Sequence, residues 1–138
     1  MVHWLYPANT KFYDVLGAMA EKETYWPIHT QVSPGDKLLI YLAAPYKQVG
    51  FVCDVLEIGL SGKTVMQHAA PFLKGKPESG KPGKAFMKLR PVISVPIDPK
   101  SVLGLAHLKR RGLTGMLMGP RRLENNPELL KYILENLP

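Results

Sequence analysis

The chain has 138 residues, of which 46% are hydrophobic and 21% charged, so we expect one globular domain over residues 1–138. No apolar run approaches the roughly 20 residues that a membrane-spanning helix needs. The first residues lack the basic head and apolar run of a signal peptide. The single cysteine, Cys53, cannot form an internal disulfide, and its apolar neighbours predict a core position. These features predict a cytoplasmic protein that does not attach to membranes.

The formal net charge of +7 is concentrated in two parts of the chain. Residues 1–60 contain four Lys or Arg and six Asp or Glu, so this part is slightly acidic. Eleven of the 18 basic residues lie in residues 74–90 and 109–122, beside one acid, Glu78. Neutralising phosphates supplies most non-specific affinity for nucleic acids, so this clustering favours a polyanionic partner. A solvated basic face without a function is the alternative.

Apolar and alternating stretches predict a chain rich in strands. Strands are expected over residues 2–6, 38–44, 49–58, 64–68 and 85–95, with residues 113–119 as a further candidate. The second and third of these are joined by a short turn, which predicts an antiparallel hairpin. In the last long strand, Met87 and Leu89 should face one side of the sheet and Lys88 and Arg90 the other.

Helix signals occur in three places. Helices are expected over residues 11–20, 98–111 and 127–137. Asn9 is an N-cap candidate for the first, and a cap followed by Pro begins each of the other two. Residues 21–32 are polar and contain Pro27, and residues 71–84 are rich in Pro, Gly and Lys, so both predict loops. The order of elements predicts an α+β fold with a curved antiparallel sheet or small barrel.

Motifs for catalysis and nucleotide binding are missing. Residues 59–64 end in Gly-Lys-Thr as a P-loop does, but Glu57 stands where the first glycine is required. The four histidines lack metal-ligand spacing. No Ser, Cys or Asp lies in a nucleophile motif. We therefore expect a protein that is not an enzyme and that uses no metal or cofactor.

The most specific pattern lies between Trp26 and Tyr41. Trp26 precedes the turn Val32-Ser33-Pro34-Gly35-Asp36, which leads into the apolar segment Leu39-Ile40-Tyr41. Together with the segment from Trp4 to Asn9 and the strand from Phe51 to Glu57, this pattern resembles the EVE family, a PUA-like family related to the YTH readers of methylated adenine. The resemblance covers nearly the whole chain. It implies an α+β fold, namely a PUA-like/EVE bent antiparallel β-barrel with flanking α-helices.

The resemblance also implies a pocket that holds a modified base between aromatic walls. Trp26 matches one wall, Tyr41 matches the family's strand tyrosine, and Asn9 falls where polar groups contact the base edge. YTH readers have further tryptophans after the second long strand, where this chain has only His68 and Phe72, so Tyr46 could complete the cage. The implied base pocket consists of Asn9, Trp26, Tyr41, Tyr46, His68 and Phe72. The implied phosphate contacts are Lys84, Lys88, Arg90, Arg121 and Arg122. From the residues alone, Trp26 and Tyr41 fit a hydrophobic core equally well.

The implied function is recognition of a modified, for example methylated, base in DNA, as the reader part of a modification-dependent restriction system. A nuclease or NTPase would then be the effector domain or subunit. Flipping a base costs a few kcal/mol, and stacking on aromatic rings returns about 1–3 kcal/mol. Two alternatives stay open: a reader of modified RNA, and a small enzyme or small-ligand-binding protein that uses the barrel mouth. Steep salt dependence would separate nucleic-acid binding from binding of a neutral ligand.

Overall fold

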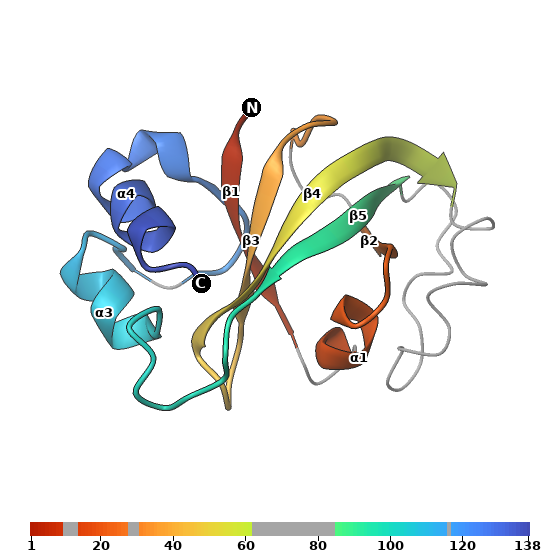
Figure 1. Cartoon of the computed structure of the whole chain (residues 1–138). Coiled ribbons are helices and arrows are strands. Elements are labelled where there is room, and N and C mark those ends of the chain that lie inside the picture. The colour runs from red at the N-terminus through yellow and green to blue at the C-terminus, as the bar shows by residue number, and fades with distance from the viewer. Residues whose placement is uncertain (10–13, 28–30, 62–84, 116) are drawn as a thin grey trace.

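A curved six-stranded sheet with helices on both faces forms the molecule (Figure 1). The structure is a computed structural model that describes residues 1–9, 14–27, 31–61, 85–115 and 117–138. The strands are β1 (His3–Ala8), β2 (Thr24–Pro27), β3 (Lys37–Leu42), β4 (Gln48–Ser61), β5 (Ala85–Ser94) and β6 (Arg121–Arg122). The helices are α1 (Val15–Met19), α3 (Leu105–Arg110), the 3-10 turn η3 (Leu123–Asn125) and α4 (Pro127–Glu135).

The sheet is mixed and has the strand order β2-β5-β4-β3-β1-β6. β1 and β3 run parallel, and the chain crosses between them through α1 and β2. All other neighbouring strands are antiparallel, including the predicted β3–β4 hairpin. Among the described strands, the edges β2 and β6 do not pair with each other, so the sheet does not close. The α+β class is confirmed, whereas the closed, purely antiparallel barrel is wrong.

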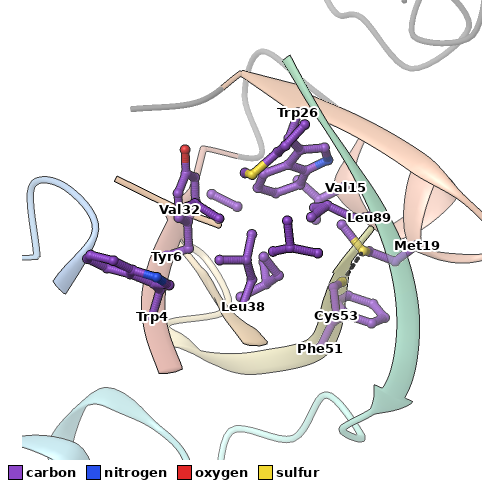
Figure 2. Close-up of a cluster of buried hydrophobic side chains, with 14 of the residues drawn as sticks. Trp4, Tyr6, Val15, Met19, Trp26, Val32, Leu38, Phe51, Cys53 and Leu89 are labelled. Carbon is purple, nitrogen blue, oxygen red and sulfur yellow. Dashed lines mark hydrogen bonds between the residues drawn. The ribbon is translucent and has the colours of Figure 1, made fainter. Parts of the chain in front are cut away.

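Two hydrophobic cores lie on opposite faces of the sheet. Successive residues of a strand point to opposite faces, so in β1 Trp4 and Tyr6 join the first core and Leu5 the second. The first core, drawn in Figure 2, is covered by α1, and the second by α3 and α4. Because both faces of β3 are covered, every residue from Leu38 to Leu42 is buried. A strand that is buried on both faces has a continuous apolar sequence, and β3 has one from Leu38 to Leu42.

Local signals place α4 correctly. The Asn126 side chain accepts a hydrogen bond from the Leu129 amide (3.3 Å), and Pro127 begins the helix as predicted. Leu129 and Ile133 face the second core, whereas Leu134 is 44% exposed. Cys53 is fully buried, as predicted, and so are Leu39 and Leu89.

Helix α3 is shorter than predicted. Residues 98–104 form successive turns, closed by bonds from the Ser101 amide to the Asp98 carbonyl (2.9 Å) and from the Gly104 amide to the Ser101 carbonyl (3.0 Å). Asp98 therefore caps a turn, and its side chain accepts from the Lys100 amide (2.8 Å). Val102 lies in these turns and is 45% exposed, although the predicted helix includes it. The helix does end at Gly112, whose φ of 113° suits only glycine.

Three further predictions need correction. Helix α1 covers only Val15–Met19 and is capped by Asp14, not Asn9, because the Asp14 side chain accepts from the Gly17 amide (3.1 Å). Part of the predicted loop 21–32 is the strand β2, which pairs with β5. The late strand is β6, paired with Trp4 and Leu5, and not residues 113–119. The strand predicted at 64–68 and the loop 71–84 lie outside the described residues.

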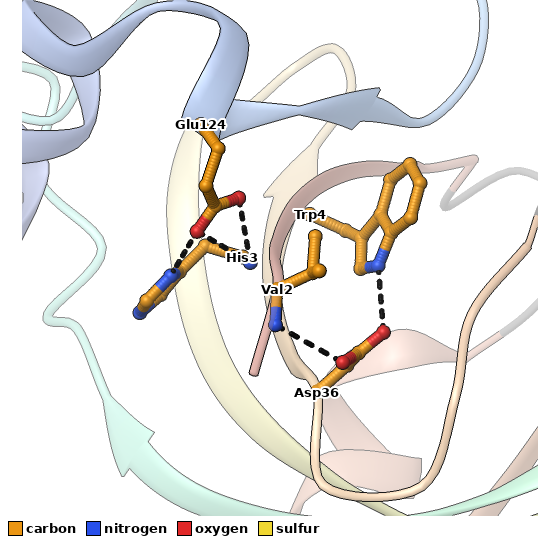
Figure 3. A network of polar contacts seen from close by, with 5 residues as sticks. All are labelled: Val2, His3, Trp4, Asp36 and Glu124. Carbon is orange, nitrogen blue, oxygen red and sulfur yellow. Dashed lines mark hydrogen bonds and ion pairs between the residues drawn. The ribbon is translucent and has the colours of Figure 1, made fainter.

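Asp36, in the turn before β3, fixes the start of the chain (Figure 3). Its buried carboxylate accepts hydrogen bonds from the amides of Val2 and Ser33 and from the Trp4 indole Nε1, each at 3.0 Å. Burial alone would raise the Asp36 pKa, but the bonds from Ser33, Trp4 and Val2 outweigh it and hold the pKa below its usual value. The charged carboxylate therefore stabilises the pairing of β1 with β3.

A second carboxylate joins β1 to the C-terminal part of the chain. Glu124 in η3 accepts from the His3 amide with both oxygens (2.9 and 3.1 Å) and contacts the His3 ring Nδ1 at 2.7 Å (Figure 3). Burial raises the Glu124 pKa, but the hydrogen bonds from His3 outweigh it and lower the pKa overall. β1 is thus held by one carboxylate on the β3 side and by another on the β6 side.

We predict that Asp36 makes stability depend on acid pH. The pKa of Asp36 is lower in the folded than in the unfolded chain. Asp36 therefore contributes fully to the free energy of unfolding above its unfolded pKa of about 3.9, and this contribution is lost as the pH falls through the folded pKa. Asp36→Asn should cost about 1–3 kcal/mol at neutral pH and flatten the loss of stability below about pH 4. Urea unfolding at several pH values measures both effects. Glu21→Gln, at an exposed carboxylate, should change neither, and an Asp36→Asn protein with the wild-type pH profile would contradict the assignment.

Candidate nucleic-acid interface

The two aromatic residues predicted to wall one pocket lie on opposite faces of the sheet. Trp26 belongs to the first core, where it is 5% exposed and meets the Tyr6 ring edge-to-face at 6.1 Å between centroids (Figure 2). Tyr41 belongs to the second core and is 6% exposed, and burial raises its pKa. Along β3, Tyr41 and Leu39 point to the second core, whereas Leu38 and Ile40 point to the first. The prediction that Trp26 and Tyr41 enclose a base together is therefore wrong.

Asn9 and Tyr46 lie at one end of the sheet. The parallel pairing of β1 and β3 brings the ends of these strands together, and the Ala43 amide donates to the Ala8 carbonyl (3.0 Å). Asn9, just after β1, is exposed. Tyr46, in the turn after β3, is half-buried and packs against the first core. The other predicted site residues His68, Phe72 and Lys84 lie outside the described residues.

The two predicted phosphate contacts on β5 form ion pairs. Lys88 Nζ lies 3.1 Å from a Glu23 carboxylate oxygen, and Arg90 Nη2 lies 3.0 Å from Asp54. Asp54 also pairs with Lys37, and although burial raises its pKa, the hydrogen bonds from Lys37 and Arg90 lower it overall. The positive charges of Lys88 and Arg90 are thus matched by carboxylates, which reduces their attraction for phosphate.

A groove of about 760 Å³ lies between the β3–β4 turn and the residues that lead into α3; we call it the α3 groove. Its lining contains backbone and side chains from both segments. The lining residues are Pro45, Tyr46, Lys47, Gln48, Ile97, Asp98, Pro99, Ser101, Gly104, Leu105, Ala106, His107 and Lys109. Tyr46, which belongs to the predicted base pocket, is among them.

Gln48 holds the two walls of the α3 groove together. Its side chain is 1% exposed, and its Nε2 donates to the carbonyls of Val49 (3.1 Å) and Pro96 (3.0 Å). Its Oε1 accepts from the Asp98 amide (3.0 Å). The Leu105 amide adds a bond to the Lys47 carbonyl (2.9 Å). Sequence analysis placed Gln48 in a turn and missed this role; the only signal is a polar residue just before the apolar run Val49–Cys53.

The α3 groove carries positive charge that no carboxylate in the described part of the chain neutralises. Lys47 and Lys109 line it and are exposed, and Arg110 is exposed beside it. None of these three cations forms an ion pair with a described carboxylate. Asp98 is the single acid in the lining. Cations in the last turn of α3 also interact favourably with the helix dipole, which is a structural role that phosphate binding does not exclude.

A second groove, of about 620 Å³, lies beside β1 and β6; we call it the β6 groove. Its lining includes both predicted arginines but no carboxylate of the described residues. The lining residues are Trp4, Leu5, Gln31, Gly112, Leu113, Thr114, Pro120, Arg121, Arg122, Leu123, Asn125, Asn126 and Leu129. Arg121 Nη1 donates to the Thr114 carbonyl (2.5 Å), and Arg122 is exposed. The structure therefore brings Arg121 and Arg122 together at one groove.

Metal and membrane features were also considered. Within the described ranges, no cluster of three or more His, Cys, Asp or Glu side chains could hold a metal ion. None of the helices found there is long and apolar enough to cross a membrane.

Comparison with known structures identifies the fold. An ASCH protein from Zymomonas mobilis, solved as a single-residue variant, matches with a TM-score of 0.67 and 14% identity, over 99% of this chain and 96% of that one. A protein from Pseudomonas syringae matches with a TM-score of 0.65 and 14% identity, over 96% and 97% of the chains. A hypothetical protein from Leishmania major matches with 0.62 and 17%, over 98% and 93%. Neither the protein-family profiles nor the curated protein sequences gave a match.

These similarities define the class of fold. ASCH domains have the PUA-like fold, so the chain has a PUA-like α+β fold. The fold agrees with the PUA-like fold that the resemblance to the EVE family implies. Membership of the EVE family itself stays a prediction.

We predict that Trp26 acts in the core. Trp26→Ala should lower the free energy of unfolding by about 3–5 kcal/mol, because it removes a large buried ring that packs against Tyr6. Chemical denaturation measures the loss. Met118→Ala, at a side chain that is 82% exposed, should change stability by less than about 0.5 kcal/mol. A Trp26→Ala protein as stable as the Met118→Ala protein would show that the ring is not packed as described.

We predict that Gln48 positions the walls of the α3 groove. Gln48→Ala leaves the Pro96 carbonyl and the Asp98 amide without their partner, so it should cost about 1–3 kcal/mol. The Asp98 amide should also exchange its hydrogen faster in the native protein. Gln31→Ala, at an exposed glutamine, is the matched control and should change neither quantity. Unchanged exchange at Asp98 in Gln48→Ala would contradict the role.

Proposed function

We propose that the chain is a nucleic-acid-binding module, a binding protein and not an enzyme, which contacts its partner at the α3 groove. The observation that carries the proposal is the set of unmatched cations there. Lys47, Lys109 and Arg110 surround a concave surface and have no carboxylate partner among the described residues. Lys88 and Arg90, by contrast, are ion-paired. Unmatched cations attract phosphates and release counterions when they bind them.

The fold supports this proposal. The chain has the PUA-like fold, and its sequence resembles EVE and YTH proteins, which also have that fold. This resemblance implies nucleic-acid binding. The grooves also have a suitable size, since volumes of about 300–1,000 Å³ are typical of pockets for small organic groups. An unpaired nucleotide is a group of this kind.

Recognition of a modified base is the finer form of the proposal. Tyr46 lines the α3 groove and is half-buried, so it offers an aromatic surface on which a base can stack. Asn9 is exposed at the same end of the sheet. A methyl group removed from water in such a groove contributes about 0.8 kcal/mol. Two kinds of nucleic acid could carry such a base. One is DNA, read as part of a restriction system with a nuclease or NTPase, and the other is modified RNA. Competition binding compares the two.

We predict that Lys47→Ala with Lys109→Ala weakens binding to all nucleic-acid sequences alike. The slope of log affinity against log salt should become shallower by about 1.4 for a single strand or about 1.8 for duplex DNA, because two phosphate contacts are lost. Fluorescence anisotropy at several salt concentrations measures the slope. Lys88→Ala with Arg90→Ala is the matched control, since it removes the same charge from ion-paired sites and should change the slope less.

The outcomes separate the competing functions. Equal slopes for both double variants would show that the α3 groove is not the phosphate-binding face. Binding of a neutral small ligand without salt dependence would favour the small-ligand alternative. The wild-type protein can also be compared on oligonucleotides with a methylated and an unmethylated base. Equal affinity for both, in DNA and in RNA, would overturn base recognition but leave nucleic-acid binding in place.

A further inference from the structure

The α3 groove runs along α3 as far as Lys109, and the β6 groove begins at Gly112, just after the end of that helix. Leu105, His107 and Lys109 of α3 line the first groove. Gly112 and the residues that follow it line the second. We propose that one single-stranded nucleic acid occupies both grooves and crosses the end of α3 between them. This inference rests on the proposed function and adds the form of the partner and the path that it takes.

The length of the two grooves along α3 suits a short segment of single strand. From Leu105 in the first groove to Gly112 in the second, the helix and its last turn rise about 1.5 Å per residue, or about 10 Å in all. Successive nucleotides advance by about 3.4 Å along a stacked strand, so about three steps cover this distance. Three steps join four nucleotides, so the contact surface covers about four nucleotides, with one seated in each groove. This is within the range of about 4–16 nucleotides that small barrel folds bind.

Cations mark both ends and the middle of this path. Lys47 and Lys109 line the α3 groove, and Arg122 is exposed in the β6 groove. Arg110 is exposed at the end of the helix, and next to it the Arg111 guanidinium lies 4.8 Å above the Tyr132 ring centroid. In the linings of both grooves, as far as the structure describes them, Asp98 is the only carboxylate.

The presence of two separate grooves favours a single strand over a duplex. The bases of a duplex are stacked inside it, and extruding one base costs a few kcal/mol. Filling both grooves from a duplex would require two such extrusions close together, whereas a single strand presents every base without unpairing. In the β6 groove, the exposed side chains of Thr114 and Asn125 can form hydrogen bonds with a base edge.

A length series of single strands tests the proposal. Binding of oligothymidine and oligouridine from about two to about twelve nucleotides should strengthen with length and level off near about four. Arg122→Ala should bind the shortest strands as tightly as the wild type does, but its affinity for the longer strands should be several-fold lower. Its salt slope for long strands should become shallower by about 0.7. Arg122→Lys should restore most of this loss, because it keeps the charge.

Controls and contrary outcomes separate this inference from the proposed function. Lys131→Ala removes an exposed charge that lines neither groove and should leave the length dependence unchanged. The two-groove path would be overturned if Arg122→Ala weakened binding of the shortest and longest strands equally. It would also be overturned if a matched duplex bound more tightly than the single strand. A wild-type protein that binds no oligonucleotide of any kind would instead overturn the proposed function. Melting temperatures show that each variant is folded.

Discussion

The carboxylate of Asp36 is the interaction on which the arrangement of this fold depends. A parallel pair such as β1 and β3 has no tight turn to set its register, because the chain crosses over through α1 and β2. Asp36 supplies that register by accepting from the Val2 amide and the Trp4 indole while it closes its own turn through Ser33. β1 then sends side chains to both cores, pairs with β6 and lines the β6 groove. Burial would otherwise raise the Asp36 pKa, and three donors offset it: Ser33 in the same turn, Val2 just before β1, and Trp4 within β1.

Features encoded by neighbouring residues could be predicted from the sequence, and features that depend on distant pairing could not. The β3–β4 hairpin and the start of α4 at Asn126-Pro127 follow from turn and cap residues that lie next to each other. β2 was missed because it lies in a mostly polar segment and ends in Pro27, and only its pairing with β5 makes it a strand. The same limit explains the error about Trp26 and Tyr41. Alternation along β3 separates Tyr41 from Ile40, but the face that Trp26 occupies is set by β5, which lies about 60 residues away in the sequence.

Charge counts have the same limit. The sequence reveals where basic residues cluster, but the cations that remain unmatched are decided by which acids the fold brings near them. Lys88 and Arg90 are neutralised by Glu23 and Asp54, which belong to the acidic first part of the chain. Lys109 and Arg110 lie on α3, on the face of the sheet opposite α1, and no described carboxylate reaches them. The acidic first part of the chain therefore pairs with the two described cations of one basic cluster, whereas Lys109 and Arg110 of the other cluster have no described carboxylate partner and can attract a polyanion.

Hydrogen bonds from the Gln48 and Asn126 side chains to the backbone connect the segments that line the two grooves, which bears on how a flexible partner would bind. At one end of α3, Gln48 and the Lys47 carbonyl fix the turns that lead into the helix. At the other end, Asn126 Nδ2 donates to the Gly112 carbonyl (2.9 Å), and a Cβ at Gly112 would meet that same Nδ2 at 2.9 Å. Glycine at this position thus lets the cap of α4 close directly on the end of α3. The spacing of the grooves is then set before binding, so the ordering cost falls on the nucleic acid alone. A partner whose backbone matches that spacing without bending loses the least entropy, which favours a strand that is already stacked over one that is fully flexible.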